Sequence, residues 1–379
     1  MRVIPEKLSI SDENQIDLTI RNHYPFEIMI EIIDEIPFQF QKRDFSIKET
    51  LLPFQEKHIP YTLTPLERGE FIFGHTNIYA RSFLNLVTRR FTLNQEHLVK
   101  TYPAFLKLKK FDLKTINHLN SSYGLKKVRR IGNSFEFEQI KDYVQGDNIR
   151  NLNWKATAKK NQLMINQFTD EKSQQIYLII DKGRTMKMPF QGLSLLDYAI
   201  NSALVLSHII LQKQDKAGLF SFSKTVENFI VSQRRNNQLS LILEALYNIE
   251  TKHLESNYGL LYNAIKQQVK QRSLLILFTN FDSMDALHRQ LNYLKSINKS
   301  HLLLIVFFKN TEILAISQKN TKTDFEMIRK TISEKFIYDQ EQMVLELRKH
   351  GIYSILTTPE NLTVDTINKY IEIKTRGLI

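Results

Sequence analysis

The chain has 379 residues, of which 42% are hydrophobic and 24% are charged, a composition typical of folded proteins that bury sizeable cores. It contains no cysteine, which excludes disulfide bridges, thiolate zinc sites and cysteine nucleophiles. The net charge of +12 is unevenly distributed, because residues 104–172 carry 14 Lys and Arg against 7 Asp and Glu, whereas residues 1–103 carry 12 against 14. A basic middle segment either attracts an anionic partner or is only a solvated face.

Residues 1–103 are predicted to form an antiparallel β-sandwich. Short β-rich runs, many of them alternating, include "IDLTIRN", "FEIMIEIIDE", "EKHIPYTLTP", "GEFIFGHTNIYA" and "LVTRRFTL", and Pro, Asn or Gly turn signals separate them. This spacing, without a helical period, is typical of a sandwich. The dipeptide "YP" at 102–103 closes the unit.

Residues 104–172 predict a basic, loop-rich connector with a few strands that pack on the domain that follows. The run "LKLKKFDLKTINHL" indicates a short helix, and "LMINQF" indicates an alternating strand. Between them lie a predicted turn at Gly146 and Asp147 and the only tryptophan, Trp154.

Residues 173–379 are predicted to form a mostly parallel, doubly wound α/β domain. The apolar strands "QQIYLIID", "SLLILFTN" and "HLLLIVFF" alternate with segments of helical period at 193–212, 236–249 and 257–270. The runs "KAGLFSFS" and "TVENFIVS" predict two strands joined tightly at residues 223–224, and the chain ends in a predicted helix. Fully apolar strands that alternate with helices are typical of parallel sheets covered on both faces.

Polar residues follow two of these apolar strands. Asp181 ends the first strand with Thr185 in the same loop, and Asn280 and Asp282 follow a later one. Doubly wound sheets bind ligands at this edge, which we call the crest, and oxygen ligands from several loops suit a hard cation such as Mg²⁺. Asp and Thr are also ordinary capping residues at such turns, so both interpretations stay open here.

Sequence motifs for catalysis are absent from the chain. It has no GxxxxGK[ST], no GxGxxG after a strand, no GxSxG and no HExxH, and its ten histidines are scattered. We therefore expect a protein that is not an enzyme.

Three blocks of the sequence resemble domain-of-unknown-function family 58, a von Willebrand factor A-type family often encoded beside MoxR-type AAA+ ATPases. They are "EFEQIKDYVQGDNIRNLNWKATAKKNQLMINQF", "LIIDKGRTM" and the C-terminal "INKYIEIKTRGLI". With the predicted sandwich, the resemblance covers essentially the whole chain. It implies a von Willebrand A fold whose crest can hold a metal-ion-dependent adhesion site.

The resemblance also implies that this metal site is degenerate. Asp181 and Thr185 match the first and last positions of the family's DxSxS loop, but Gly183 replaces the middle serine. Asn257 in "ESNY" and Asn280 in "FTNFD" stand where family members often have Asp, with Asp282 two residues on. Because these changes remove charge and a hydroxyl, we expect Mg²⁺ to bind weakly or not at all.

The first block includes the family motif residues Gly146, Asp147, Arg150, Asn153 and Trp154. They form either a docking surface or a structural anchor. We favour the anchor, in which Trp154 is buried against the sheet while Asp147 and Arg150 pair to fix the turn. Such a connector would hold the sandwich in place relative to the A domain.

The resemblance implies a non-enzymatic adaptor that works with a MoxR-type AAA+ ATPase, and with other von Willebrand A or membrane proteins, in assembling or maintaining envelope complexes. Arg184 and Lys187 make the first crest loop basic and are our candidate partner-binding residues. The alternatives are a nucleic-acid-binding protein that uses the basic connector, which lacks interleaved aromatic residues, and a metal-dependent hydrolase, which lacks a general base.

No signal peptide is visible, and the longest apolar runs are far shorter than the ~20 residues that cross a bilayer. We therefore expect the chain as given to be soluble. Family members usually have an N-terminal membrane hairpin, so the resemblance implies a location in the cytoplasm or on the cytoplasmic face of the inner membrane.

Overall fold

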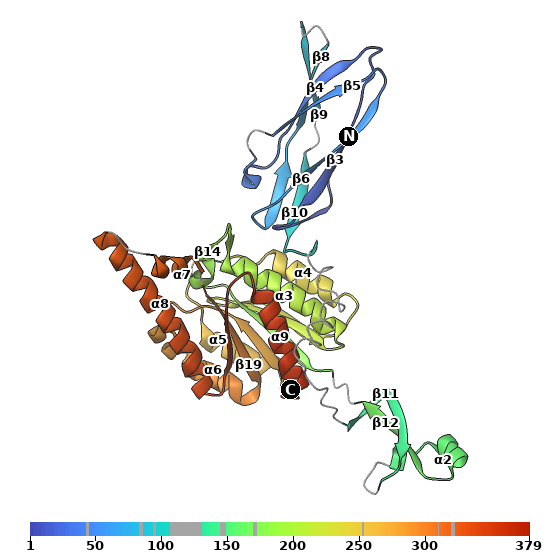
Figure 1. Ribbon diagram of the computed structural model, residues 1–379, viewed down its shortest axis with the longest axis vertical. Coiled ribbons are helices and arrows are strands. Elements are labelled where there is room, and N and C mark those ends of the chain that lie inside the picture. The colour runs from blue at the N-terminus through green and yellow to red at the C-terminus, as the bar shows by residue number, and fades with distance from the viewer. Residues whose placement is uncertain are drawn as a thin grey trace.

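The computed structural model describes residues 1–42, 45–82, 86–93, 96–106, 131–144, 149–169, 173–251, 254–309, 311–319 and 323–379. Figure 1 shows three parts: an N-terminal β region, a larger α/β region, and a small arm of residues 131–169 that projects from the α/β region. Most of the predicted connector helix, at 107–119, and the predicted turn at Gly146 and Asp147 lie outside the described residues.

The N-terminal β region consists mainly of antiparallel sheets, as the alternating runs predict. In β4 (Ile28–Asp34) every second side chain is buried, and the sheets β1-β3-β6, β2-β10-β7 and β5-β4-β8-β9 enclose one apolar core. The exception is β10 (His97–Tyr102), which pairs in parallel with β2 (Lys7–Ser9). The other elements are β1 (Arg2–Val3), β3 (Asn14–Arg21), η1 (Phe38–Phe40), β5 (Ser46–Leu51), β6 (Glu56–Leu63), β7 (Gly69–Phe73), β8 (Thr76–Ser82) and β9 (Thr88–Leu93).

The α/β region is a six-stranded mixed sheet of order β17-β16-β13-β18-β19-β20, in which only the edge strand β17 is antiparallel. The strands are β13 (Gln175–Asp181), β16 (Lys216–Phe222), β17 (Val226–Gln233), β18 (Leu274–Phe278), β19 (Leu302–Phe308) and β20 (Tyr353–Thr357). The helices are α3 (Leu195–Gln212), α4 (Gln238–Tyr247), α5 (Tyr258–Gln268), α6 (Met284–Ser300), α7 (Thr311–Gln318), α8 (Asp324–Lys349) and α9 (Leu362–Thr375). A short turn, η4 (Arg184–Lys187), and a small hairpin of β14 (Pro189–Phe190) and β15 (Leu193–Ser194) precede α3.

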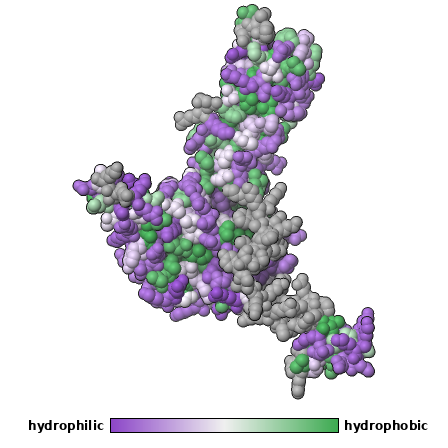
Figure 2. Space-filling view, viewed as in Figure 1, coloured by the Kyte–Doolittle hydropathy of each residue, from purple (hydrophilic) through white to green (hydrophobic). Residues whose placement is uncertain are grey.

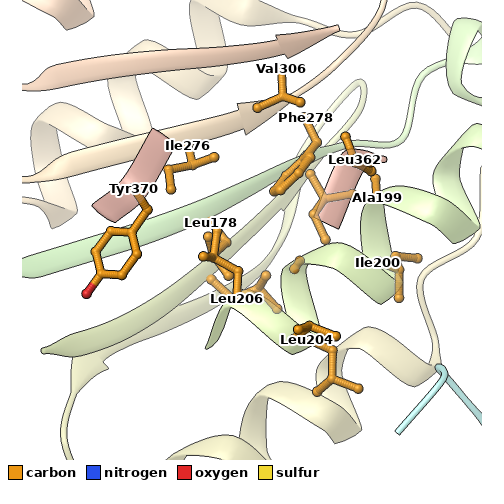
Figure 3. Close-up of a cluster of buried hydrophobic side chains, with 14 of the residues drawn as sticks. Leu178, Ala199, Ile200, Leu204, Leu206, Ile276, Phe278, Val306, Leu362 and Tyr370 are labelled. Carbon is orange, nitrogen blue, oxygen red and sulfur yellow. The ribbon is translucent and has the colours of Figure 1, made fainter. Parts of the chain in front are cut away.

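Helices cover both faces of this sheet. Leu178 and its even-numbered neighbours in β13 pack with α3, α4 and α9, whereas Tyr177 and Ile179 pack with α5, α6 and α8. Figure 3 shows Leu178 beside Leu206 of α3, within the first of these two cores. By length and composition α3 is the one described helix that is apolar enough to cross a membrane, but 67% of it is buried, as in a core helix.

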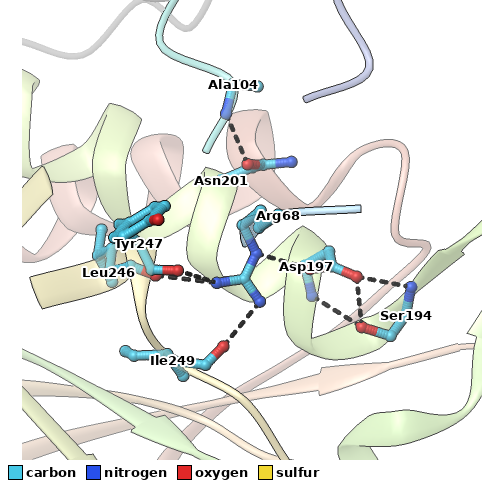
Figure 4. Close-up of polar contacts among 8 residues, drawn as sticks. All are labelled: Arg68, Ala104, Ser194, Asp197, Asn201, Leu246, Tyr247 and Ile249. Carbon is cyan, nitrogen blue, oxygen red and sulfur yellow. Dashed lines mark hydrogen bonds and ion pairs between the residues drawn. The ribbon is translucent and has the colours of Figure 1, made fainter. Parts of the chain in front are cut away.

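Arg68, in the loop between β6 and β7, joins the β region to the α/β region. Its side chain is 8% exposed, and Nε donates to Asp197 of α3 at 2.8 Å. The same guanidinium donates to the backbone carbonyls of Leu246, Tyr247 and Ile249 at and after the end of α4, at 2.9, 3.4 and 2.9 Å (Figure 4). One side chain therefore supplies hydrogen bonds to carbonyl groups at the helix end, where the regular helical donors run out.

Aromatic and backbone contacts extend this interface between the β region and the α/β region, which we call the joint. Tyr102 stacks on Tyr247 with ring centroids 4.7 Å apart, and its hydroxyl donates to Glu244 at 2.9 Å. The backbone N–H of Ala104 donates to Asn201 of α3 at 2.9 Å. The β region is thus held by direct packing on α3 and α4. The prediction that the connector fixes the two domains through Trp154 is wrong.

The arm consists of the hairpin β11 (Ile131–Asp142) and β12 (Met164–Thr169), with η3 (Ile149–Asn151) and α2 (Trp154–Lys160) between the strands. It projects from the α/β region instead of packing on it as predicted (Figure 1). The predicted burial of Trp154 is also wrong, because its side chain is 69% exposed. Among the arm's described side chains the buried apolar ones are Met164 and Ile165.

Replacing Trp154 with alanine is therefore expected to change the free energy of unfolding by no more than about 0.5 kcal/mol, as for other exposed positions. Thermal unfolding of the Trp154→Ala variant measures this directly. A loss of about 3–5 kcal/mol, the usual cost of removing a core tryptophan, would show that the indole is buried after all.

Candidate functional site

The crest of the α/β region lies where the strand order reverses, between β13 and β18. From β13 the chain continues through α3 on one face, and from β18 it continues through α6 on the other. Connections that diverge in this way leave a crevice at the carboxyl ends of the strands. Backbone hydrogen bonds tie the loops there: Arg184 N donates to Leu254 O at 3.0 Å, and Asn257 N donates to Ser223 O at 2.8 Å.

A small polar pocket of about 60 Å³ opens at this position. Five of the six predicted metal-site residues line it, and the sixth, Asn257, does not. The lining also includes side chains that the sequence had not singled out, from the loop before α5 and from α6. The lining residues are Asp181, Gly183, Arg184, Thr185, Glu255, Ser256, Tyr258, Asn280, Phe281, Asp282, Ala286, Arg289 and Gln290.

Asn257 caps a helix and is not directed at the crest. It precedes α5, and its side-chain oxygen accepts a hydrogen bond from Leu260 N at 3.1 Å, as asparagine does at many helix starts. Its neighbour Ser256 instead donates its hydroxyl to Asp181. Ser256, one residue before the predicted Asn257, is therefore the residue of this loop that contacts Asp181.

Asp181 is buried, with 2% exposure, and receives four hydrogen bonds. Oδ1 accepts from the Ser256 hydroxyl and, at 2.8 Å, from Gly183 N, while Oδ2 accepts from Thr279 at 2.6 Å and from Tyr258 at 3.1 Å. Burial raises the pKa of the Asp181 carboxyl, and these hydrogen bonds oppose the rise. The Tyr258 and Thr279 hydroxyls also lie 2.7 Å from each other, so their two protons serve three contacts. Even so, the network takes most of the roughly four acceptor positions of the carboxylate.

These residues fit a divalent cation poorly. Mg²⁺ requires near-octahedral oxygen ligands, but both Asp181 oxygens already accept hydrogen bonds and the Asp282 carboxylate lies 3.2 Å from the Arg184 guanidinium. Within the part of the chain that the structure describes, no group of three or more His, Asp or Glu side chains is placed to hold a metal. Thr185 and Asn280 would add only neutral oxygens.

We expect the chain to bind Mg²⁺ with a dissociation constant of about millimolar or weaker. The reason is that the Asp181 carboxylate already accepts hydrogen bonds and the Asp282 carboxylate is paired with Arg184. The substitution Gly183→Ser, which restores the family's serine, is expected to leave the affinity for Mg²⁺ unchanged. A Cβ at position 183 would collide with Ser256 Oγ and lie 3.0 Å from Asp181 Oδ1. Calorimetry tests both proteins, and micromolar binding that disappears in Asp181→Ala would contradict the expectation.

Two arginines lie at the pocket. Arg184 is exposed, and its guanidinium reaches Asp282 at 3.2 Å and Glu255 at 3.6 Å. Arg289 lines the pocket from α6 and is also exposed. Lys187, our second candidate partner-binding residue, ends η4 and is exposed but does not line the pocket.

The family motif residues lie in the arm, apart from the crest. Arg150 belongs to η3, while Gly146 and Asp147 lie outside the described residues, so the predicted pairing of Asp147 with Arg150 stays a prediction. Asn153 caps α2 by accepting from Ala156 N at 3.0 Å. Its role in the described structure is local.

The fold and the site together define a protein with N-terminal antiparallel β-sheets and a mixed, mostly parallel α/β region with a polar pocket at its crest. Residues 139–314 match the family described as "Protein of unknown function DUF58", so the chain carries a domain of that family. It is a distant homologue of "Uncharacterized protein YeaD" from Bacillus subtilis (strain 168), with 22% identity over 233 residues. The match covers 60% of this chain and 56% of YeaD, little more than half of that relative's length.

Two solved structures show only a weak likeness. Proximal thread matrix protein 1 from the mussel byssus has 9% identity and a TM-score of 0.27, with 51% of this chain and 45% of that chain covered. The ASH/PapD-like domain of human CEP192 has 11% identity and a TM-score of 0.19, with 27% and 83% covered. Likenesses of this size carry no argument about function.

Proposed function

We propose that the chain is a non-enzymatic interaction protein, in which a β-sandwich and a von Willebrand A-type domain present the crest pocket to a partner protein. The observation that carries the proposal is the pocket itself, where Arg184 and Arg289 lie beside an Asp181 that already accepts hydrogen bonds at both carboxylate oxygens. In this proposal the two arginines, rather than a metal ion, recognise an acidic side chain of the partner.

The size of the pocket supports an acidic side chain as the group that enters. A volume of about 60 Å³ is roughly that of two water molecules, and a carboxylate group is of similar size. Guanidinium groups bind carboxylates with two parallel hydrogen bonds. An aspartate or glutamate on a protruding loop of the partner therefore has both the size and the charge that the pocket requires.

The ion pairs that Arg184 already makes do not prevent this exchange. The side chains of Arg184, Asp282 and Glu255 are 56%, 49% and 67% exposed, and ion pairs as exposed as these contribute about 0–1 kcal/mol. A partner carboxylate that excludes water from the pocket forms stronger bonds with the same guanidinium.

The partner that the sequence resemblance implies is a MoxR-type AAA+ ATPase, and the task is the assembly or maintenance of envelope proteins. The DUF58 domain over residues 139–314 supports this assignment only at the level of the family. We place the protein in the cytoplasm or at the cytoplasmic face of the inner membrane, where such an ATPase has access to ATP.

The partner assignment is tested by mixing the full chain with the MoxR-type ATPase encoded nearest to its gene and separating the mixture by size-exclusion chromatography. We expect the two proteins to elute together, both with Mg²⁺ and with EDTA, because the proposed contact needs no metal ion at the crest. Separate elution under both conditions would overturn the partner. Elution together only with Mg²⁺, when the ATPase alone has the same assembly state in both buffers, would overturn the metal-free contact.

A further inference from the structure

We propose that the arm of residues 131–169 docks on an anionic lipid bilayer. Its described surface combines exposed apolar side chains with exposed lysines, and this combination is independent of the crest. Neither the joint nor the sheet core uses these side chains. Membrane docking by the arm and partner binding at the crest would therefore use different surfaces of the protein.

The apolar part of this surface is large for an arm of this size. Ile149, Trp154 and Leu163 are 67%, 69% and 48% exposed, and they lie in or beside η3, α2 and the start of β12. Single exposed apolar residues are normal, but several on one small module indicate an interaction surface. Figure 2 shows hydrophobic and hydrophilic residues side by side on the arm.

Within residues 149–163 of the arm the charged side chains have one sign. Residues 149–163 contain Arg150, Lys155, Lys159 and Lys160 and no Asp or Glu, and the three lysines are exposed. Each Lys or Arg near an anionic membrane surface contributes about 1 kcal/mol of binding. This segment is therefore complementary in charge to acidic lipid headgroups, whereas the four acidic residues of the arm, Glu136, Glu138, Asp142 and Asp147, lie before it in the chain.

The apolar side chains favour lipid over nucleic acid as the partner. Tryptophan is enriched at the membrane interface, and aliphatic groups such as those of Ile149 and Leu163 gain free energy when they enter the acyl region. Single-stranded nucleic acid instead requires a series of aromatic side chains on which bases stack, and aliphatic groups add little there. The charged ammonium groups of the lysines can reach the headgroups while their apolar stems lie beside the inserted residues.

The arm is held in shape by its own hydrogen bonds, so docking needs no folding step. β11 and β12 pair with Ile140 opposite Asn166 and with Asp142 opposite Met164. The Thr157 hydroxyl accepts from Met164 N at 3.0 Å, which fixes α2 on the hairpin. Because the arm projects from the α/β region (Figure 1), it reaches a flat surface without moving the core.

The sole tryptophan reports on this contact, since Trp154 is the only indole in the chain. The full chain is titrated with vesicles of phosphatidylcholine alone and of equimolar phosphatidylcholine and phosphatidylglycerol, and both tryptophan emission and co-sedimentation are measured. We expect a blue shift and co-sedimentation with the mixed vesicles and neither with phosphatidylcholine alone. Unchanged emission with the mixed vesicles would overturn the proposal, as would an equal shift with DNA.

Three variants that keep Trp154 complete the test. Ile149→Ser with Leu163→Ser is expected to abolish the shift, and Lys155→Gln, Lys159→Gln and Lys160→Gln together are expected to weaken binding roughly 100-fold. The matched control is Phe325→Ser with Ile332→Ser on α8, where the side chains are 68% and 63% exposed. This control is expected to bind like the wild type, and if it loses binding as the arm variants do, the assignment of the surface to the arm is wrong.

Discussion

Replacing Asp34 with alanine is expected to lower the free energy of unfolding of the β region by about 3–5 kcal/mol, the usual cost of leaving one buried charge without its partner. Asp34 lies in β4, and its Oδ1 is 2.5 Å from Arg2 Nη1, with side chains that are 0% and 1% exposed. The hydroxyls of Tyr61 and Thr76 also donate to this carboxylate. The substitution removes a shared acceptor from two hydroxyls in the core and from the Arg2 guanidinium, which still donates to Gly74 O at 2.9 Å.

Denaturant unfolding of Asp34→Ala measures this loss, with Glu49→Ala as the control. Glu49 pairs with Lys57 at 2.7 Å, but both side chains are about one third exposed, so its removal is expected to cost about 0–1 kcal/mol. Equal losses in the two variants would show that burial does not decide the cost.

Replacing Arg68 with alanine is expected to have the second largest effect, a loss of about 3 kcal/mol in the free energy of unfolding. The substitution removes a buried charged donor and with it several hydrogen bonds. The guanidinium is the donor to Asp197 and to carbonyl groups at the end of α4. The joint between the β region and the α/β region is therefore expected to loosen as well as to lose stability.

Calorimetry and small-angle X-ray scattering test the two parts of this expectation. In Arg68→Ala the unfolding transition should move to lower temperature, and the scattering should indicate a wider range of interdomain distances. Arg68→Lys should recover only part of the loss, because one ammonium cannot reach the same set of acceptors as a planar guanidinium. Full recovery with lysine would mean that charge alone holds the joint.

The parts of the fold that follow local periodicity were predictable from the sequence. The alternation in "FEIMIEIIDE" gave β4, and the fully apolar runs gave β13, β18 and β19 with helices between them. The parallel pairing of β2 with β10 was not predictable, since it joins the two ends of the β region and neither segment has a local sign of it. A lone arginine in a loop, Arg68, likewise gave no sign of the joint.

At the candidate site, strand ends could be predicted but hydrogen-bond partners could not. Asp181 and Asn280 were placed correctly at the crest because strand ends meet there. Ser256 and Thr279 were missed, although each is adjacent to a residue that had been singled out, because their direction depends on where α5 begins and where β18 ends. Trp154 was misassigned because a large aromatic side chain is usually mostly buried, whereas the structure leaves this one 69% exposed on the arm.

The dissociation constant for the MoxR-type ATPase in the presence of EDTA tests whether the crest arginines bind the partner. The crest variant is Arg184→Gln with Arg289→Gln. The control is Arg234→Gln with Arg235→Gln, two exposed arginines just after β17, whose antiparallel direction places them at the opposite edge of the sheet. Both variants lose the same charge.

We expect the crest variant to weaken binding roughly 100-fold, because two charge-assisted hydrogen-bonding groups are lost. The control is expected to change the dissociation constant by less than about threefold, as for other remote exposed charges. Equal dissociation constants for the crest variant and the wild type would contradict the account and remove the crest as the partner-binding surface.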